Sequence, residues 1–224
     1  KVRASGVIVG AWGITPAKIA KRVAEVAGLP LMVHIGEPPP LIDEIFDILT
    51  PGDIVTHCFN GKKAGSIQDT PGLFAAAKDL ARRGVRMDIG HGAASFNFET
   101  ARKAIGVGLT PFSISTDLHL NNIDGPVHDM ATTLSKMLAV GLPLEECIEA
   151  VAARPRGFLG LSGSGGPTPG MRADFTAFDL VDKRLDSVDS QGNHLAADRI
   201  FEPRLTVLGA SVERAARRGG DMAP

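Results

Sequence analysis

The sequence has few cysteines and no marked excess of either charge. Its two cysteines, Cys58 and Cys147, are far apart and form no CxxC motif, so neither a disulfide framework nor a thiolate zinc site is indicated. We expect both to be buried, reduced thiols. Lysine and arginine together number 24 against 25 acidic residues, without a long run of either sign. This balance argues against nucleic acid as a partner.

Long apolar runs are also absent. No stretch reaches the roughly eighteen to twenty apolar residues of a membrane-spanning helix, and the first residues lack the apolar core of a secretory signal. We therefore expect a cytoplasmic protein with no membrane partner. The early glycine-rich phosphate loop of many doubly wound sheets is missing too. An open doubly wound sheet thus stays only as an alternative fold.

What the sequence does contain is a repeated strand and helix pattern. Its 224 residues, 44% of them hydrophobic, are sufficient for one main core. Thr15 and Pro16 are typical of a helix start, and Gly28 of a helix end. Short apolar runs then alternate with helical periodicity. The expected strands are 31–35, 53–57, 85–89 and 111–116, and the expected later helices are 41–49, 73–83, 98–105, 127–140 and 144–153.

Four such units amount to half of an eight-stranded parallel barrel. The sequence thus predicts an α/β fold in which residues 1–159 form the second half of a (β/α)8 TIM-like barrel. From about residue 160 glycine, proline, aspartate and β-branched residues dominate, which predicts a small β subdomain over 160–210, followed by a tail over 211–224. Because half a barrel leaves unpaired edges, and because the chain starts with lysine, we expect an absent N-terminal segment to supply the other strands.

Polar side chains recur at the ends of the expected strands. His34, His57, His91 and Asp117 each lie at or just beyond such an end. The carboxyl ends of barrel strands converge, so these side chains can meet around one ion. Imidazoles and a carboxylate are suitable ligands for Zn and other divalent ions. A shared site is a stronger interpretation than four unrelated structural residues.

The same strand ends carry a family resemblance. The motifs are VHIGE at 33–37, THCFNG at 56–61, DIGHG at 88–92 and STDLH at 115–119. In this order they resemble the amidohydrolase superfamily, in particular its dihydroorotase-like amidohydrolase/deacetylase branch. GPTPG at 166–170, followed by ADF at 173–175, is similar to the return of that superfamily into its small β subdomain. The resemblance extends to about residue 210.

The resemblance implies a metal centre with two Zn ions, or other divalent metals. His34, His57 and Asp117 match metal ligands of the family, and Lys1 matches a lysine that reacts with carbon dioxide to give a carbamate bridging both ions. Asp117 would also move protons. The His-x-His pair that the family carries on its first strand is absent from this chain.

The resemblance also implies a substrate pocket. His91 would contact the substrate, and Gly90 would let the backbone approach it. His119 and Asn121 would line the pocket. We expect Lys62 and Lys63, by contrast, to be solvated surface residues.

The implied reaction is hydrolysis of an amide, a cyclic amide or an ester in a small acyl substrate. A metal-activated hydroxide would attack, and Asp117 would carry the proton to the leaving group. Two other functions remain open: a non-catalytic amidohydrolase-like assembly protein, and a metal-assisted barrel lyase. A homo-oligomer also remains open.

Overall fold

A parallel sheet forms the first part of the computed structural model, which describes residues 1–161 and 168–218. Its strands lie side by side in chain order. Val33 pairs with Val2 on one side and with Val55 on the other, so the central strands are hydrogen-bonded on both edges. The strands are β1 (Val2–Ala4), β2 (Met32–Ile35), β3 (Ile54–Thr56) and β4 (Arg86–Asp88). Three of the four expected strands are thereby confirmed.

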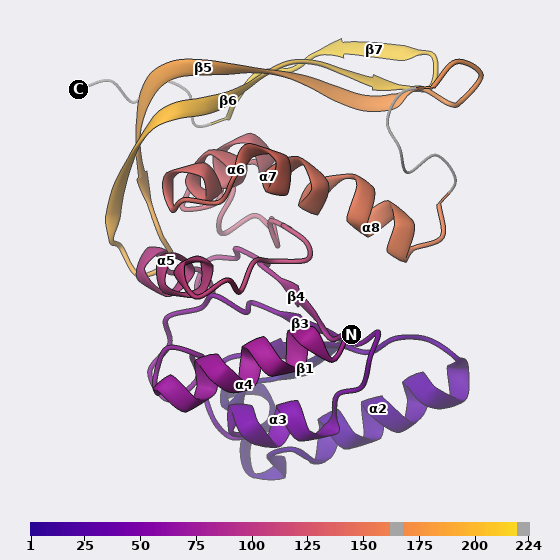
Figure 1. The fold of residues 1–224 in the computed structure, drawn as a ribbon, viewed down its shortest axis with the longest axis vertical. Helices are drawn as coiled ribbons and strands as arrows, with labels where there is room; N and C mark the ends of the chain where they lie inside the picture. The colour runs from indigo at the N-terminus through magenta and orange to yellow at the C-terminus, as the bar shows by residue number, and fades with distance from the viewer. Residues whose placement is uncertain (162–167, 219–224) are drawn as a thin grey trace.

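Helices connect these parallel strands, as the periodicity predicts. Thr15 and Pro16 open α2, and Gly28 ends it with a left-handed φ of 65°. Figure 1 shows α2, α3 and α4 together on one side of the sheet. The helices of this part are α1 (Gly6–Val9), η1 (Gly10–Trp12), α2 (Thr15–Ala27), α3 (Ile42–Ile48), α4 (Pro71–Arg82) and α5 (Phe98–Gly106).

The prediction of a strand at 111–116 was wrong, because this segment forms no regular strand. This segment runs beside β4 but forms only one isolated bridge, between Asp88 and Ser113. Its carbonyl groups accept hydrogen bonds from the backbone of the 89–92 segment, where Gly90 and Gly92 have φ values of 49° and 57°. Such left-handed turns break the regular pleat, so the pairing continues without forming a strand.

Three helices and an antiparallel sheet complete the structure. The expected helix 144–153 is two helices, interrupted at Ala152. Figure 1 shows β5 and β6 arching over these helices and reaching α5 at one end. The elements are α6 (Met130–Ala139), α7 (Leu144–Val151), α8 (Ala153–Phe158), β5 (Asp174–Val188), β6 (His194–Leu208) and β7 (Ser211–Arg214).

The β7 strand lies where the sequence predicts a tail. Residues 211–214 pair with β6, so at least these four residues extend the antiparallel sheet. Part of the GPTPG motif, at 166–167, and the end of the expected tail, at 219–224, lie outside the described residues.

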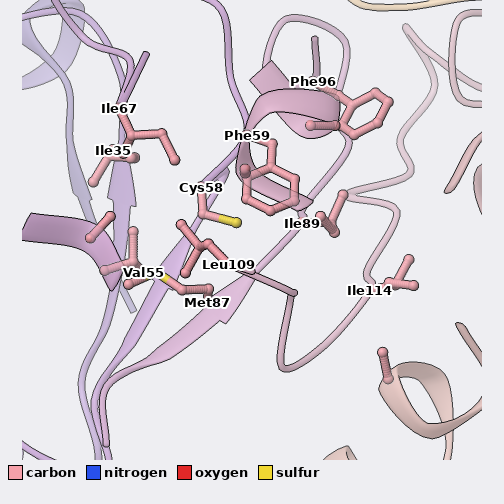
Figure 2. Close-up of a cluster of buried hydrophobic side chains, with 14 of the residues drawn as sticks. Ile35, Val55, Cys58, Phe59, Ile67, Met87, Ile89, Phe96, Leu109 and Ile114 are labelled. Carbon is pink, nitrogen blue, oxygen red and sulfur yellow. The ribbon is translucent and has the colours of Figure 1, made fainter. Parts of the chain in front are cut away.

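The main core lies between the parallel sheet and its helices. Figure 2 shows side chains from neighbouring strands and from the loops after them meeting in one cluster, including Val55, Cys58, Phe59, Met87 and Ile89. Both cysteines are buried and unpaired, as expected. Burial raises the pKa of the Cys58 thiol well above its usual value, so the thiol stays protonated.

Candidate active site

Two imidazole rings meet at the carboxyl ends of neighbouring strands. His34 is the third residue of β2, and His57 directly follows β3. Their ring centroids are 4.2 Å apart and the rings meet edge to face. Both residues are buried, with 7% and 1% of their surface exposed. The Nε2 atom of each ring is buried and has no hydrogen-bond partner among the described residues. Such atoms are costly unless another group binds them.

A backbone carbonyl fixes the orientation of His57. Its Nδ1 lies 2.5 Å from the Gly90 carbonyl oxygen. Because a carbonyl can only accept, Nδ1 carries the proton and Nε2 keeps its lone pair. Gly90 must be glycine here. A Cβ at this position would lie 2.3 Å from Thr56 Oγ1 and 2.8 Å from His57 Nδ1.

Both rings are held in the neutral form. Burial, together with the charges of His57 and Arg3, lowers the pKa of His34 to about 3. Burial also lowers the pKa of His57, although the bond to Gly90 and the carboxylate of Asp117 oppose this effect. A neutral imidazole is the form that binds metals. The electrostatic environment thus favours a ligand role over a cationic one.

Asp117 and Lys1 lie close enough for their charges to act on this pair. Both are exposed. The carboxylate of Asp117 raises the pKa of His57, while the charge of Lys1 lowers the pKa of both rings. Asp117 and His57 are two of the four described non-glycine residues with left-handed φ, at 48° and 66°. Strained backbone of this kind concentrates at functional sites.

The residues fit a metal in part. Two buried, neutral imidazoles with unpaired Nε2 atoms form one side of a coordination sphere. Within residues 1–161 and 168–218, however, no group of three His, Cys, Asp or Glu side chains is close enough to hold an ion. A complete metal sphere therefore needs a ligand beyond the two rings, for which Lys1 and Asp117 are the available candidates.

His91 differs from the other two histidines because both of its ring nitrogens have partners. Its Nδ1 donates to the Gly92 carbonyl at 3.0 Å, and its Nε2 lies 3.0 Å from Lys136 Nζ. The side chain is fully buried. Burial, followed by the Lys136 charge, lowers the pKa of His91 to about 3. A contact between its Nε2 and a substrate would require the lysine to move.

The loop after Asp117 presents His119 and Asn121 on the surface. The neighbouring Asn122 is instead fully buried. Its Nδ2 donates to the Asp117 carbonyl at 2.9 Å, and its Oδ1 accepts from the His119 backbone N–H at 2.8 Å. Asn122 therefore shapes the loop that carries Asp117. In the sequence it is indistinguishable from Asn121 beside it.

Sequence reasoning missed the role of Asp88. This carboxylate is 2% exposed and accepts hydrogen bonds from the hydroxyl groups of Thr56, Ser113 and Ser115, at 2.6, 2.6 and 2.8 Å. It joins β3, β4 and the segment that leads to Asp117. The sequence did contain a signal for this role, because Asp88 stands in an otherwise apolar strand. A carboxylate buried there needs hydrogen-bond partners.

The expectation for Lys62 was wrong. Its side chain is only 13% exposed and its Nζ lies 2.9 Å from Glu37 Oε1. Burial raises the pKa of Glu37, but hydrogen bonds from Lys62 and Ser5 outweigh this effect and lower it to about 2. The Lys62 cation lies near His34, whose pKa it lowers. Lys63, by contrast, is exposed as expected.

Comparisons with known proteins give a consistent picture, although no family model matches the chain. A deacetylase of Brucella anthropi is 52% identical over 217 residues, which is 97% of this chain and 54% of the relative. The crystal structure of a dihydroorotase matches with a TM-score of 0.93 and 51% identity, over 97% of this chain and 57% of the other. That of an adenine deaminase matches with a TM-score of 0.87 and 37% identity, over 96% and 59%. The chain spans little more than half the length of these proteins.

Proposed function

We propose that this chain carries part of the active site of a metal-dependent hydrolase acting on C–N or ester bonds. The basis is that the chain belongs to the amidohydrolase superfamily. The substrate would be a small amide, cyclic amide or ester, as in a deacetylase or a dihydroorotase. The observation that carries this proposal is the pair of buried, unpaired Nε2 atoms of His34 and His57. The names of the relatives support the reaction class.

In this proposal four side chains hold the metal, namely Lys1, His34, His57 and Asp117. Zn would be the ion, with two ions in the site, and Lys1 would contribute to holding them as a carbamate. Such ions, when bound, supply a water of lowered pKa and polarise the carbonyl of the substrate. Two features support the ligand set: the neutral state of both imidazoles, and the position of Lys1 near both rings.

Asp117 would do the proton transfer. This residue is exposed and its charge acts on His57, so a substrate near the imidazole pair can reach the carboxylate. A carboxylate in that position accepts a proton from the attacking water and returns it to the leaving amine or alcohol. Gly90, His91, His119 and Asn121 would border the substrate, with the loop after Asp117 forming the rim.

We also propose that further polypeptide completes a (β/α)8 barrel around this site. Within the described part of the chain, β1 pairs on one edge, with β2, and its other edge has no strand beside it. On the adjoining helix α2 the apolar residues Ile19, Val23 and Val26 are 60, 62 and 83% exposed. They recur at helical spacing and form an apolar stripe that a soluble surface does not ordinarily carry. None of the described helices is long and apolar enough to cross a bilayer, so the stripe does not lie on a membrane span in the described part.

The test is turnover by the protein that carries this chain, assayed with an N-acetyl amino acid, a cyclic amide and an aryl acetate. Release of acetate or ring opening is the expected result. Replacing Asp117 with Asn should reduce kcat at least 100-fold while the metal content stays within error of the parent, because one oxygen ligand remains. Undiminished turnover by Asp117→Asn removes the proton-transfer role. Metal loading without turnover of any probe favours the assembly alternative.

A further inference from the structure

The Gly90–Gly92 segment connects His57 to the start of the loop that carries Asp117. The Gly90 carbonyl accepts from His57 Nδ1. The backbone N–H groups of His91 and Gly92 donate to the carbonyls of Ser115 and Thr116, both at 3.0 Å. Those two residues immediately precede Asp117. The position of the 90–92 segment therefore sets both the direction of the His57 ring and the start of the Asp117 loop.

Lys136 contacts this segment from helix α6. Its side chain is 1% exposed, which is exceptional for a lysine. The ammonium donates to three acceptors, His91 Nε2 at 3.0 Å, the Pro126 carbonyl at 2.5 Å and the Val188 carbonyl at 2.7 Å. An ammonium has three donors, and each has one partner. Among residues 1–161 and 168–218 no carboxylate pairs with it directly, so there the ammonium is held by neutral acceptors.

The three acceptors come from three separate parts of the chain. His91 belongs to the 90–92 segment, Pro126 to the loop that begins at Asp117, and Val188 to the end of β5. The turn after β5 adds a second contact, because Ser190 Oγ donates to the Gly92 carbonyl at 3.0 Å. Burying a cation is costly unless its donors are all satisfied. Lys136 lies between three loops at the candidate site, where a buried leucine would avoid this cost. Its presence therefore points to a role that needs its hydrogen bonds.

We propose that Lys136 is a positioning residue for the active site: it fixes His91 in the Nδ1–H tautomer and thereby sets the 90–92 segment, which orients His57 and the start of the Asp117 loop. The inference rests on the proposed function for its catalytic consequence. The contact between Lys136 and His91, and its effect on the His91 tautomer, do not depend on the proposed function. Because the Lys136 ammonium can only donate, His91 Nε2 keeps its lone pair, so the ring proton lies on Nδ1 and is donated to the Gly92 carbonyl.

The test compares Lys136→Met with Ser135→Ala, which lies beside it in α6. Ser135 is fully buried and accepts from the Phe201 backbone N–H at 3.0 Å, so it reports on helix packing without touching the site loops. Imidazole 1H–15N correlation spectra give the tautomer of each histidine. Zn titration against a chelating dye gives metal affinity, and the acyl probes give kcat and KM. Loss of a positioning contact behind a metal ligand typically costs 10- to 100-fold in affinity or activity.

We expect Lys136→Met to lose the fixed Nδ1–H signal of His91, to bind Zn about 10-fold more weakly and to lower kcat with little change in KM. Ser135→Ala should keep the His91 Nδ1–H signal, the Zn affinity and the kcat of the parent. If Met at position 136 prevents folding, Lys136→Leu, which also lacks a donor, is measured in the same way. An unchanged His91 tautomer in either folded variant overturns the proposal. If the parent shows no turnover, the hydrolase function fails while the tautomer spectrum still decides the role of Lys136.

Discussion

The imidazole of His34 lies edge to face against that of His57, with 4.2 Å between the ring centroids. The rings reach this contact from two neighbouring parallel strands, and both leave Nε2 buried without a partner among the described residues. Two neutral rings packed only for stability would ordinarily satisfy these atoms with backbone or solvent. Unpaired Nε2 atoms are what the proposed ligand set requires of these two rings.

Substituting Gly90 should disturb the site more than substituting another glycine of similar backbone conformation. Gly90 and Gly28 both have left-handed φ, but a Cβ on Gly90 would clash with Thr56 and His57, whereas Gly28 has open space. We expect Gly28→Ala to lower the free energy of unfolding by about 1 kcal/mol and Gly90→Ala by roughly 3 kcal/mol. Urea denaturation measures both.

The Gly90→Ala variant should also bind Zn more weakly, because the clash displaces the His57 ring. Gly28→Ala serves as the matched control and should bind Zn like the parent. Equal stability losses in the two variants would mean that the contact with His57 places no demand on position 90.

Removing the buried carboxylate of Asp88 should destabilise the fold. Asp88→Ala leaves the hydroxyl groups of Thr56, Ser113 and Ser115 without their shared acceptor. Hydrogen bonds to a charged group contribute about 1.5–3 kcal/mol each, so we expect a loss of roughly 3 kcal/mol or more in the free energy of unfolding. The exposed Asp198 gives the control variant Asp198→Ala, for which we expect a change below about 0.5 kcal/mol.

The same variant should loosen the segment that leads to Asp117. Faster amide hydrogen exchange at 113–117 is the expected result in Asp88→Ala, because the carboxylate joins that segment to β3 and β4. Exchange that stays at the parent rate would show that backbone pairing with the 89–92 segment holds it alone.

Acid should destabilise the protein in part through His91. Burial lowers the pKa of His91 from its ordinary 6.5 to about 3. Between these values the unfolded chain takes up a proton that the folded protein refuses, so the contribution is intact above pH 6.5 and is lost as the pH falls toward 3. At about 1.4 kcal/mol per pKa unit, the free energy of unfolding should fall by roughly 4 kcal/mol over this range.

The measurement is the slope of unfolding free energy against pH for the parent, His91→Gln and His194→Gln. His194 is exposed on β6 and serves as the control. The slope between pH 6.5 and 3 should become shallower in His91→Gln only, whatever the absolute stability of that variant. Identical slopes in all three proteins contradict a buried, neutral His91.

Local periodicity was sufficient to predict much of the fold. The expected strands 31–35, 53–57 and 85–89 enclose β2, β3 and β4, because fully covered strands are short apolar runs. Helix ends were also readable where a residue type controls the backbone, as Gly28 does at the end of α2. The positions of His34 and His57 at strand ends follow from the same pattern.

Features that depend on distant contacts were not predictable. Lys136 lies in an expected helix, where a lysine is ordinarily exposed, and its partner Val188 is 52 residues away. The partial loss of the 111–116 strand depends on left-handed turns in the neighbouring segment. The burial of Lys62 depends on Glu37, which lies after a different strand. Periodicity predicts which face of a helix or strand is buried, but not which distant side chains contact that face.

The central claim is that His34 and His57 bind a shared metal, and Zn stoichiometry tests it most directly. The protein is loaded with Zn, dialysed and measured by elemental analysis, alongside a His34→Ala/His57→Ala double variant. A His119→Ala/His194→Ala double variant, which removes two exposed histidines, is the control. We predict that the first variant loses nearly all bound Zn and that the second keeps it. A fully loaded His34→Ala/His57→Ala protein would contradict the account.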